Sequence, residues 1–131
     1  MDHWRYSVSD PVRSSFHARG EIEEEELLID IRTELESGKR SAVLNGADQL
    51  RKILAHFFPR YKSVRVSWWF GENLVTFNRA LASGATLEAA AQRTVFGHQV
   101  ALAGFSRALI LSLEGSPARY TKVVVSFSRP S

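Results

Sequence analysis

Two β-rich runs at the end of the chain limit what the rest of it can form. They lie within "FSRALILSLEGSPARYTKVVVSFSRPS", residues 105–131, and the segment "EGSP" falls between them. Such runs, joined by a short connection with glycine and proline, predict a β-hairpin. Alternation in the last run separates two faces, one with Thr121, Val123, Val125 and Phe127 and the other with Tyr120, Lys122, Val124 and Ser126. The chain therefore needs further elements that cover one face of an antiparallel pair.

A third strand is predicted where residues alternate in "KSVRVSWWF", residues 62–70. Its two faces would carry Val64, Val66, Trp68 and Phe70 on the apolar side, and Arg65, Ser67 and Trp69 on the other. A face that combines a cation with an indole can hold a phosphate and stack a nucleobase. The alternative is that a neighbouring helix covers Trp69, because buried packing is common for aromatic side chains.

The remaining elements are predicted from apolar periodicity and from start and stop signals. We expect helices over residues 23–36, 47–58, 73–83 and 87–105, and a first strand in "HWRYSVS", residues 3–9. Residues 10–21, "DPVRSSFHARGE", are typical of a loop or an interrupted strand. The order β-α-α-β-α-α-β-β has no regular β-α-β alternation. It predicts a single α+β domain over residues 1–131, with a mostly antiparallel sheet and packed helices.

Charge is distributed unevenly along the chain, whose formal net charge is +3. Residues 21–36, "EIEEEELLIDIRTELE", hold eight of the 14 acidic residues and one basic residue, which leaves the rest of the chain with a net charge of +10. A surface of that charge attracts polyanions, among which nucleic acid is the commonest. The alternative is a solvated basic surface that only keeps the protein in solution.

Missing and isolated residue types exclude several kinds of site. The chain has no cysteine, which rules out disulfides, thiolate nucleophiles and cysteine-bound zinc. Its four histidines are far apart and lack the spacing of metal-ligand motifs, so we expect neither a metal nor a cofactor. We also expect no membrane span and no signal peptide, because no apolar run approaches roughly 18 residues and the first ten residues lack an apolar middle.

The predicted helix over residues 87–105 has an unusual group near its middle. At about 100° per residue, Thr94 and His98 fall on its inward face, with Gly97 beside them. A glycine within a helix costs roughly 1 kcal/mol relative to alanine, so we expect Gly97 to serve close packing, a kink or ligand access. His98 is then either a buried histidine that hydrogen-bonds to Thr94 or a carbonyl, or a site residue.

Residues 68–105, "WWFGENLVTFNRALASGATLEAAAQRTVFGHQVALAGF", carry a longer pattern. It consists of a tryptophan, N-L-x-x-F-N, a glycine-ended helix, an alanine pair, T-x-T-G and a closing G-F, and it resembles a segment in the C-terminal toxin domains of bacterial polymorphic toxins of the Rhs and contact-dependent-inhibition kinds. The matching residues are Trp68 or Trp69, Asn73, Leu74, Phe77, Asn78, Gly84, Ala89, Ala90, Thr94, Gly97, Gly104 and Phe105. The chain departs from the pattern at Phe96, where a threonine is expected, and at His98, where a lysine or another polar residue is expected.

The resemblance implies a secreted effector domain of bacterial competition that acts in the cytoplasm of a neighbouring cell and is neutralised by a cognate immunity protein. Many such domains are ribonucleases of a compact α+β type, with the active site on an antiparallel sheet and helices packed behind it. Because the chain also lacks metal-ligand motifs, we expect a metal-independent ribonuclease that acts on RNA such as tRNA.

Metal-free RNA cleavage needs a general base, a general acid and groups that stabilise the charged transition state. The expected catalytic residues are His98, His17, Lys122, Thr94 and Thr121. The expected substrate contacts are Arg19, Arg65, Trp69, Arg119 and Tyr120. For His17, Arg119 and Lys122 the alternative is an ordinary solvated position on a loop or hairpin.

Two other functions stay open at the level of sequence. An ADP-ribosyltransferase toxin could use Arg5 on the first strand to hold the nicotinamide dinucleotide, but the chain lacks a clear E-x-E or Q-x-E on a late strand. A non-catalytic module could bind nucleic acid or a protein through the basic residues and exposed tryptophans. Such a module should be harmless when expressed in bacteria, whereas a toxin should stop growth.

Overall fold

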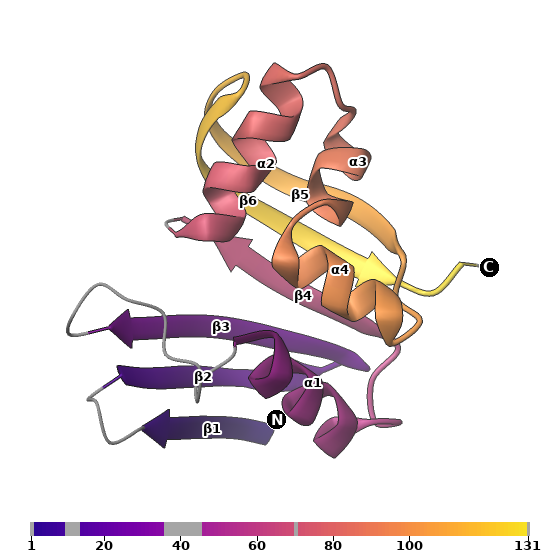
Figure 1. Ribbon diagram of the computed structural model, residues 1–131. Helices are drawn as coiled ribbons and strands as arrows, with labels where there is room; N and C mark the ends of the chain where they lie inside the picture. The colour runs from indigo at the N-terminus through magenta and orange to yellow at the C-terminus, as the bar shows by residue number, and fades with distance from the viewer. Residues whose placement is uncertain (1, 10–13, 36–45, 70, 131) are drawn as a thin grey trace.

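The computed structural model describes residues 2–9, 14–35, 46–69 and 71–130 (Figure 1). Its elements in chain order are β1 (Asp2–Ser9), β2 (Ser14–Glu23), β3 (Glu26–Leu35), α1 (Gly46–Phe57), β4 (Ser63–Trp68), α2 (Glu72–Ala82), α3 (Leu87–Gln92), α4 (Val95–Leu102), β5 (Arg107–Ser116) and β6 (Arg119–Ser128). The α+β class and the C-terminal hairpin are confirmed.

The described strands form one six-stranded sheet in the order β1-β2-β3-β4-β6-β5. β3 and β4 are parallel, and the other neighbouring pairs are antiparallel. A parallel pair cannot be joined by a tight turn, and the connection between β3 and β4 accordingly contains α1. β6 lies between β4 and β5, so the second strand of the C-terminal hairpin extends the sheet and its first strand forms an edge.

The four described helices pack on one face of the sheet (Figure 1). α1 lies over the half formed by β1, β2 and β3, whereas α2 contacts β6 and α3 contacts β5. The core between these layers comes from alternate strand residues and from one side of each helix. Its fully buried members include Leu27, Val64, Val123, Val125 and Phe127 from the sheet, and Ile53, Phe77, Phe96 and Val100 from the helices. Burying each of these side chains contributes roughly 1.5–3 kcal/mol.

The prediction of a helix over residues 23–36 is wrong, because this region forms the end of β2 and the whole described length of β3. Glu24 and Glu25 make the two-residue turn between these strands, with φ of 51° and 64°. Such left-handed pairs suit the twist of antiparallel strands. Beyond the turn, Leu27 and Ile29 are buried and Leu28 is not, which is the period of a strand. Residues 36–45 lie outside the described residues.

The prediction of a continuous helix over residues 87–105 is also wrong, because α3 ends at Gln92 and α4 begins at Val95. Thr94 has extended φ and ψ of −69° and 159°, and its hydroxyl accepts a hydrogen bond from the Gly97 amide at 2.9 Å. This N-cap starts a new helix, so the angular positions of α4 no longer follow from those of α3. Thr94 is fully buried, as predicted, whereas the prediction that His98 faces inward is wrong, because it is exposed.

The C-terminal hairpin contains a β-bulge that changes the predicted faces of β6. Lys122 pairs with Glu114, and Tyr120 pairs with Gly115, so Thr121 is an extra residue on β6. Tyr120 therefore turns to the helix side, where its ring lies 6.3 Å from that of Phe77. The prediction that Tyr120 shares a face with Lys122 is wrong for this reason.

Candidate functional site

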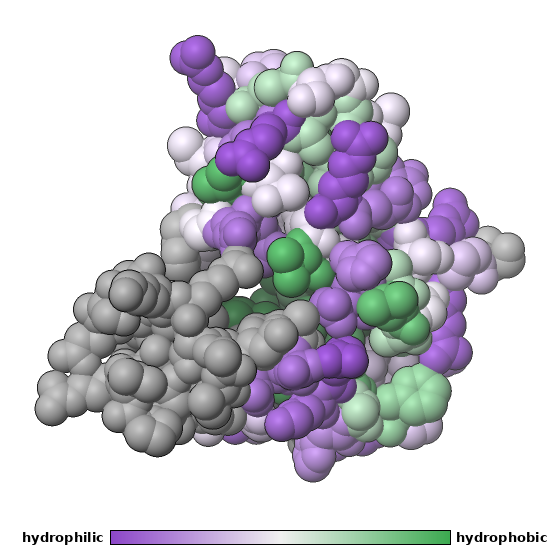
Figure 2. All heavy atoms as spheres, in the orientation of Figure 1, coloured by the Kyte–Doolittle hydropathy of each residue, from purple (hydrophilic) through white to green (hydrophobic). Residues whose placement is uncertain are grey.

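The helix side of the molecule does not gather the predicted catalytic groups. Figure 2 shows it as a mixed surface, with hydrophobic and hydrophilic areas side by side. Its exposed apolar residues, from α2, α3 and α4, are Val75, Leu87, Val95 and Leu102. Polar side chains collect instead on the opposite face of the sheet, over which none of the described helices packs.

We call this opposite sheet face the open face. It results from alternation, because the residues between its members point to the helices and form the core. Its members on β1, β2 and β3 are His3, Arg5, Ser7, His17, Arg19, Glu21, Glu26, Leu28 and Asp30. Its members on and beside β4 and β6 are Ser63, Arg65, Ser67, Trp69, Lys122, Val124 and Ser126. On these strands the open face is thus mostly polar, with both acidic and basic groups, whereas on β5 Leu109, which pairs with Ser126, is 63% exposed.

The strand register arranges the first of these residues in rows that cross the sheet. Arg5 pairs with Arg19, and Arg19 pairs with Asp30, which forms a central row that we call the arginine row. His17 pairs with Ser7 on one side of this row, and His3 pairs with Glu21 on the other. Successive rows are about 7 Å apart, because residues two positions apart in a strand share a face.

The arginine row places two arginines opposite each other, with one carboxylate beside Arg19. Arg19 Nε lies 3.3 Å from Asp30 Oδ2, and the Arg19 side chain is 63% exposed. Arg5 is exposed as well and has no ion pair within the described part of the chain. Like charges directly opposite each other in a sheet are destabilising. The row is therefore suited to receive an additional anion.

The two flanking histidines are each held through Nδ1. The hydroxyl of Ser7 lies 3.1 Å from His17 Nδ1, and a carboxylate oxygen of Glu21 lies 3.3 Å from His3 Nδ1. Both imidazoles are exposed. In each, Nε2 is then the atom available for proton transfer to a bound molecule.

An open hollow of about 750 Å³ lies along these rows. Its charged lining comes from His3, Arg5, Arg19, Glu21, Asp30 and Arg65. A smaller hollow of about 320 Å³ adjoins it and shares Arg5, Arg19 and Asp30, and its lining adds Ser7 and His17. Together the two hollows place both histidines around the arginine row.

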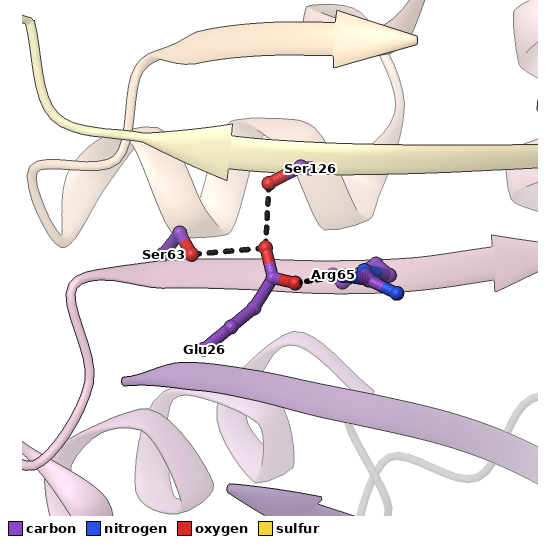
Figure 3. A network of polar contacts seen from close by, with 4 residues as sticks. All are labelled: Glu26, Ser63, Arg65 and Ser126. Carbon is purple, nitrogen blue, oxygen red and sulfur yellow. Dashed lines mark hydrogen bonds and ion pairs between the residues drawn. The ribbon is translucent and has the colours of Figure 1, made fainter. Parts of the chain in front are cut away.

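A partly buried carboxylate network lies next to the larger hollow (Figure 3). One oxygen of Glu26 accepts hydrogen bonds from Ser63 Oγ at 2.9 Å and from Ser126 Oγ at 2.8 Å, and the other forms an ion pair with Arg65. Burial of Glu26 opposes ionisation, but these hydrogen bonds and the Arg65 charge outweigh it and lower the pKa of Glu26 below its ordinary value of 4.5. The network joins β3, β4 and β6 and fixes one side of the Arg65 guanidinium.

Trp69 and Lys122 form the far end of the open face. Trp69 directly follows β4 and is 49% exposed, and Lys122 Nζ lies 6.0 Å from the centre of its ring. The alternative that a helix covers Trp69 is therefore wrong. This contact is a cation–π interaction that holds the indole in place.

Five of the predicted site residues lie on the open face, with His17 and Arg19 on β2 and Arg65, Trp69 and Lys122 on and beside β4 and β6. The other five are elsewhere. His98 and Thr94 belong to the helix layer, Tyr120 packs on Phe77, and Arg119 and Thr121 lie at the tip of the C-terminal hairpin. The hydroxyl of Thr121 donates to the Glu114 carbonyl at 3.2 Å.

Several residues of the open face were not predicted as part of a nuclease site. They are His3, Arg5, Ser7, Glu21, Glu26 and Asp30. The alternation in "HWRYSVS" was the available signal, because it places His3, Arg5 and Ser7 on one face of a strand.

The residues on which the resemblance to polymorphic toxin domains is based lie largely in the scaffold. Asn73 Oδ1 accepts a hydrogen bond from the Phe96 amide at 3.1 Å, which ties α2 to the start of α4. Asn78 donates to the Tyr120 carbonyl at 3.0 Å and accepts from the Tyr120 amide at 2.9 Å, which ties α2 to β6. With Thr94 at the N-cap, these residues fix how the helices join one another and the sheet.

Comparisons with models of known protein families, with curated proteins and with solved structures gave no match. Within the described ranges, no group of three histidine, aspartate or glutamate side chains could hold a metal ion. None of the described helices is long and apolar enough to cross a membrane.

Proposed function

We propose that this protein is a metal-independent ribonuclease whose active site is the arginine row with His17 and His3. The observation that carries the proposal is the pair Arg5 and Arg19, which lie opposite each other while Asp30 forms an ion pair with Arg19 alone. A phosphodiester between the two guanidiniums would supply the missing negative charge, and guanidinium geometry matches phosphate oxygens.

The proposed reaction divides two proton transfers between the histidines. Neutral His17 takes the proton of a ribose 2′-hydroxyl, the 2′-oxygen attacks phosphorus, and the bond from phosphorus to the 5′-oxygen breaks. Protonated His3 gives a proton to that leaving oxygen. The products are a 2′,3′-cyclic phosphate and a 5′-hydroxyl end. Arg5 and Arg19 stabilise the charge that develops on the non-bridging oxygens.

The register supports this division of roles, because the histidines lie in the rows on either side of the arginines. Their Cα atoms are four positions apart along the strands, which is about 14 Å. Side chains in strands lean along the strand, and catalytic contacts often tighten only when substrate binds. Both imidazoles are exposed and can turn toward a phosphate in the arginine row.

The biological setting that we propose rests on the resemblance of residues 68–105 to polymorphic toxin domains. In that setting the protein is an effector of bacterial competition that degrades RNA, such as tRNA, in the cytoplasm of the target cell. A cognate immunity protein would neutralise it by blocking the open face.

The direct test is cleavage of labelled tRNA by the purified protein in the presence of EDTA. We expect the wild type to cleave and His17→Ala to be slower by about 10²-fold or more, the range for loss of an acid or base. His98→Ala is the matched control, because it removes an exposed histidine from the helix side. Intact RNA with the wild type would contradict the proposal, as would cleavage that only a divalent metal restores.

A second candidate is a non-catalytic RNA-binding protein, which the exposed Trp69 beside Lys122 also suits. Expression in bacteria separates the two. Growth arrest with fragmented RNA supports the ribonuclease, and normal growth with retained RNA binding supports the binding protein.

A further inference from the structure

Trp69 and Lys122 are separate from the arginine row but lie on the same face of the sheet. Ser67 lines the large hollow together with Arg19 and Asp30. Trp69 follows two positions later in the chain, about 7 Å further along the strand direction. Because β3 lies between β2 and β4, the indole is also two to three strands to the side of Arg5 and Arg19, roughly 14 Å from the proposed phosphate site.

Small side chains border Trp69 on the open face. On β4 and β6 the open face carries Ser67, Val124 and Ser126, and Val124 is paired directly with Ser67. None of these side chains rises as far from the sheet as an arginine or a tryptophan. Ser67, which also lines the large hollow, lies on the side of the guanidiniums, and a sugar can lie over it on the way to the indole.

We propose that the substrate is single-stranded RNA, and that an unpaired base about two nucleotides from the scissile phosphate stacks on Trp69 while Lys122 contacts the backbone phosphate of that nucleotide. The inference rests on the proposed ribonuclease, because it takes the arginine row as the site of the scissile phosphate. Lys122 already lies over the indole, and its flexible stem lets it move from the ring to a phosphate when the base arrives.

Exposure and shape favour a single strand over a duplex. Half of the Trp69 surface is exposed, and this surface becomes useful to RNA only if a base leaves its own stack. Double-stranded RNA is bound mainly through its backbone and 2′-hydroxyls across a minor groove. For such a partner the indole would add nothing.

The experiment measures binding of an RNA probe that cannot be cleaved, so it does not depend on catalysis. The probe is a fluorescent 2′-O-methyl oligonucleotide of about eight nucleotides, within the ~4–16 that single-strand sites span. It is offered alone or annealed to its complement, and its anisotropy is followed with the full chain. We expect the single strand to bind at least tenfold more tightly than the duplex.

Variants test each contact separately. Trp69→Ala should weaken single-strand binding by roughly five- to a hundredfold, the range for one stacked base, and Trp69→Phe should retain most of the affinity. Lys122→Gln should reduce the slope of log affinity against log salt by about 0.7, the value for one phosphate contact on a single strand. Leu102→Ala and Arg93→Gln are the controls, because both remove an exposed side chain from the helix side.

Thermal denaturation of each variant separates lost contacts from lost folding, and Trp69→Phe keeps an aromatic ring if Trp69→Ala proves unstable. Equal affinity for duplex and single strand overturns the inference, and so does unchanged binding by a folded Trp69→Ala. If the wild type binds single-stranded RNA selectively through Trp69 but leaves cleavable RNA intact, the inferred binding site is supported. In that case only the proposed ribonuclease activity is contradicted.

Discussion

Arg5 lies directly opposite Arg19 in the antiparallel pair of β1 and β2, and both side chains are exposed on the open face. Two like charges at such positions repel each other. Asp30 pairs with Arg19 and leaves the row with an excess of positive charge. The free protein therefore gives up some stability at the place where we propose that a phosphate binds.

Replacement of Arg5 should separate stability from function. We expect Arg5→Gln to raise the free energy of unfolding by about 0.2–1 kcal/mol, because it removes the cross-strand repulsion. The same change should lower the rate of RNA cleavage at least tenfold. Urea denaturation and a tRNA cleavage assay measure the two effects. Arg93→Gln, at the C-cap of α3, is the control and should change neither. Unchanged cleavage by Arg5→Gln would remove Arg5 from the site.

The role of His3 as the general acid can be tested with the leaving group. We expect His3→Ala to slow cleavage of RNA by about 10²-fold or more, because the 5′-oxygen leaves poorly without a proton. A uridine 3′-(4-nitrophenyl phosphate) substrate has a leaving group that needs no proton. On this substrate His3→Ala should be nearly as fast as the wild type.

His17→Ala is the matched variant for that comparison, since we propose it as the base. It should be slow on both substrates, because the attacking 2′-hydroxyl is the same in each. If His3→Ala is equally slow on both, His3 is not the acid. Steady-state rates on the two substrates decide between these outcomes.

The lowered pKa of Glu26 predicts that the stability of the protein depends on pH. The folded protein lowers the pKa of Glu26 below 4.5, so the unfolded state binds its proton more readily. The stabilisation by the ionised carboxylate is therefore present above about pH 4.5 and is lost as the pH falls through the lower folded-state pKa. Glu26→Gln should destabilise the protein by about 1–3 kcal/mol at pH 7, the worth of hydrogen bonds to a charged group.

The difference between wild type and Glu26→Gln should shrink as the pH falls below about 4.5. Chemical denaturation at a series of pH values measures it. Glu88→Gln, at an exposed position of α3, is the control for general effects of charge. A difference that stays constant from neutral to acidic pH would mean that ionisation of Glu26 does not stabilise the fold.

The fold could be predicted from the sequence where the pattern of apolar residues fitted only one kind of element, a helix or a strand. Residues 62–70 alternate without ambiguity, and the strand is present, although Phe70 itself lies outside the described residues. In residues 23–36, Leu27, Leu28 and Ile31 also fit a helical stripe, and pairing with β2 and β4 decides for a strand. Such pairing joins residues far apart in the chain, so no local pattern could reveal it.

The candidate site depended on register for the same reason. His17 and Arg19 were predicted from residue type, but β2 was expected to be a loop or an interrupted strand, so Arg5 had no predicted partner strand. Only the pairing of β1 with β2 shows that Arg5 and Arg19 meet. His98 was misplaced because the N-cap at Thr94 resets the helix, and a helical wheel assumes that no such break occurs.

A substitution at Gly97 tests how closely α4, which begins after the N-cap Thr94, packs against the end of α3. A Cβ on Gly97 would lie 2.1 Å from the Ala91 carbonyl oxygen and 3.0 Å from Thr94 Oγ1. Alanine normally stabilises a helix by about 1 kcal/mol relative to glycine. Here the clash is with backbone that cannot turn away, and overpacking of this kind costs about 1–3 kcal/mol.

We therefore expect Gly97→Ala to lower the free energy of unfolding by about 1–2 kcal/mol, with the clash outweighing the helix preference. Val95→Ala, at an exposed position in the first turn of α4, should stay within about 0.5 kcal/mol of the wild type. Urea denaturation compares the three proteins. A Gly97→Ala protein as stable as the wild type would show that α4 does not pack against the end of α3 as closely as described.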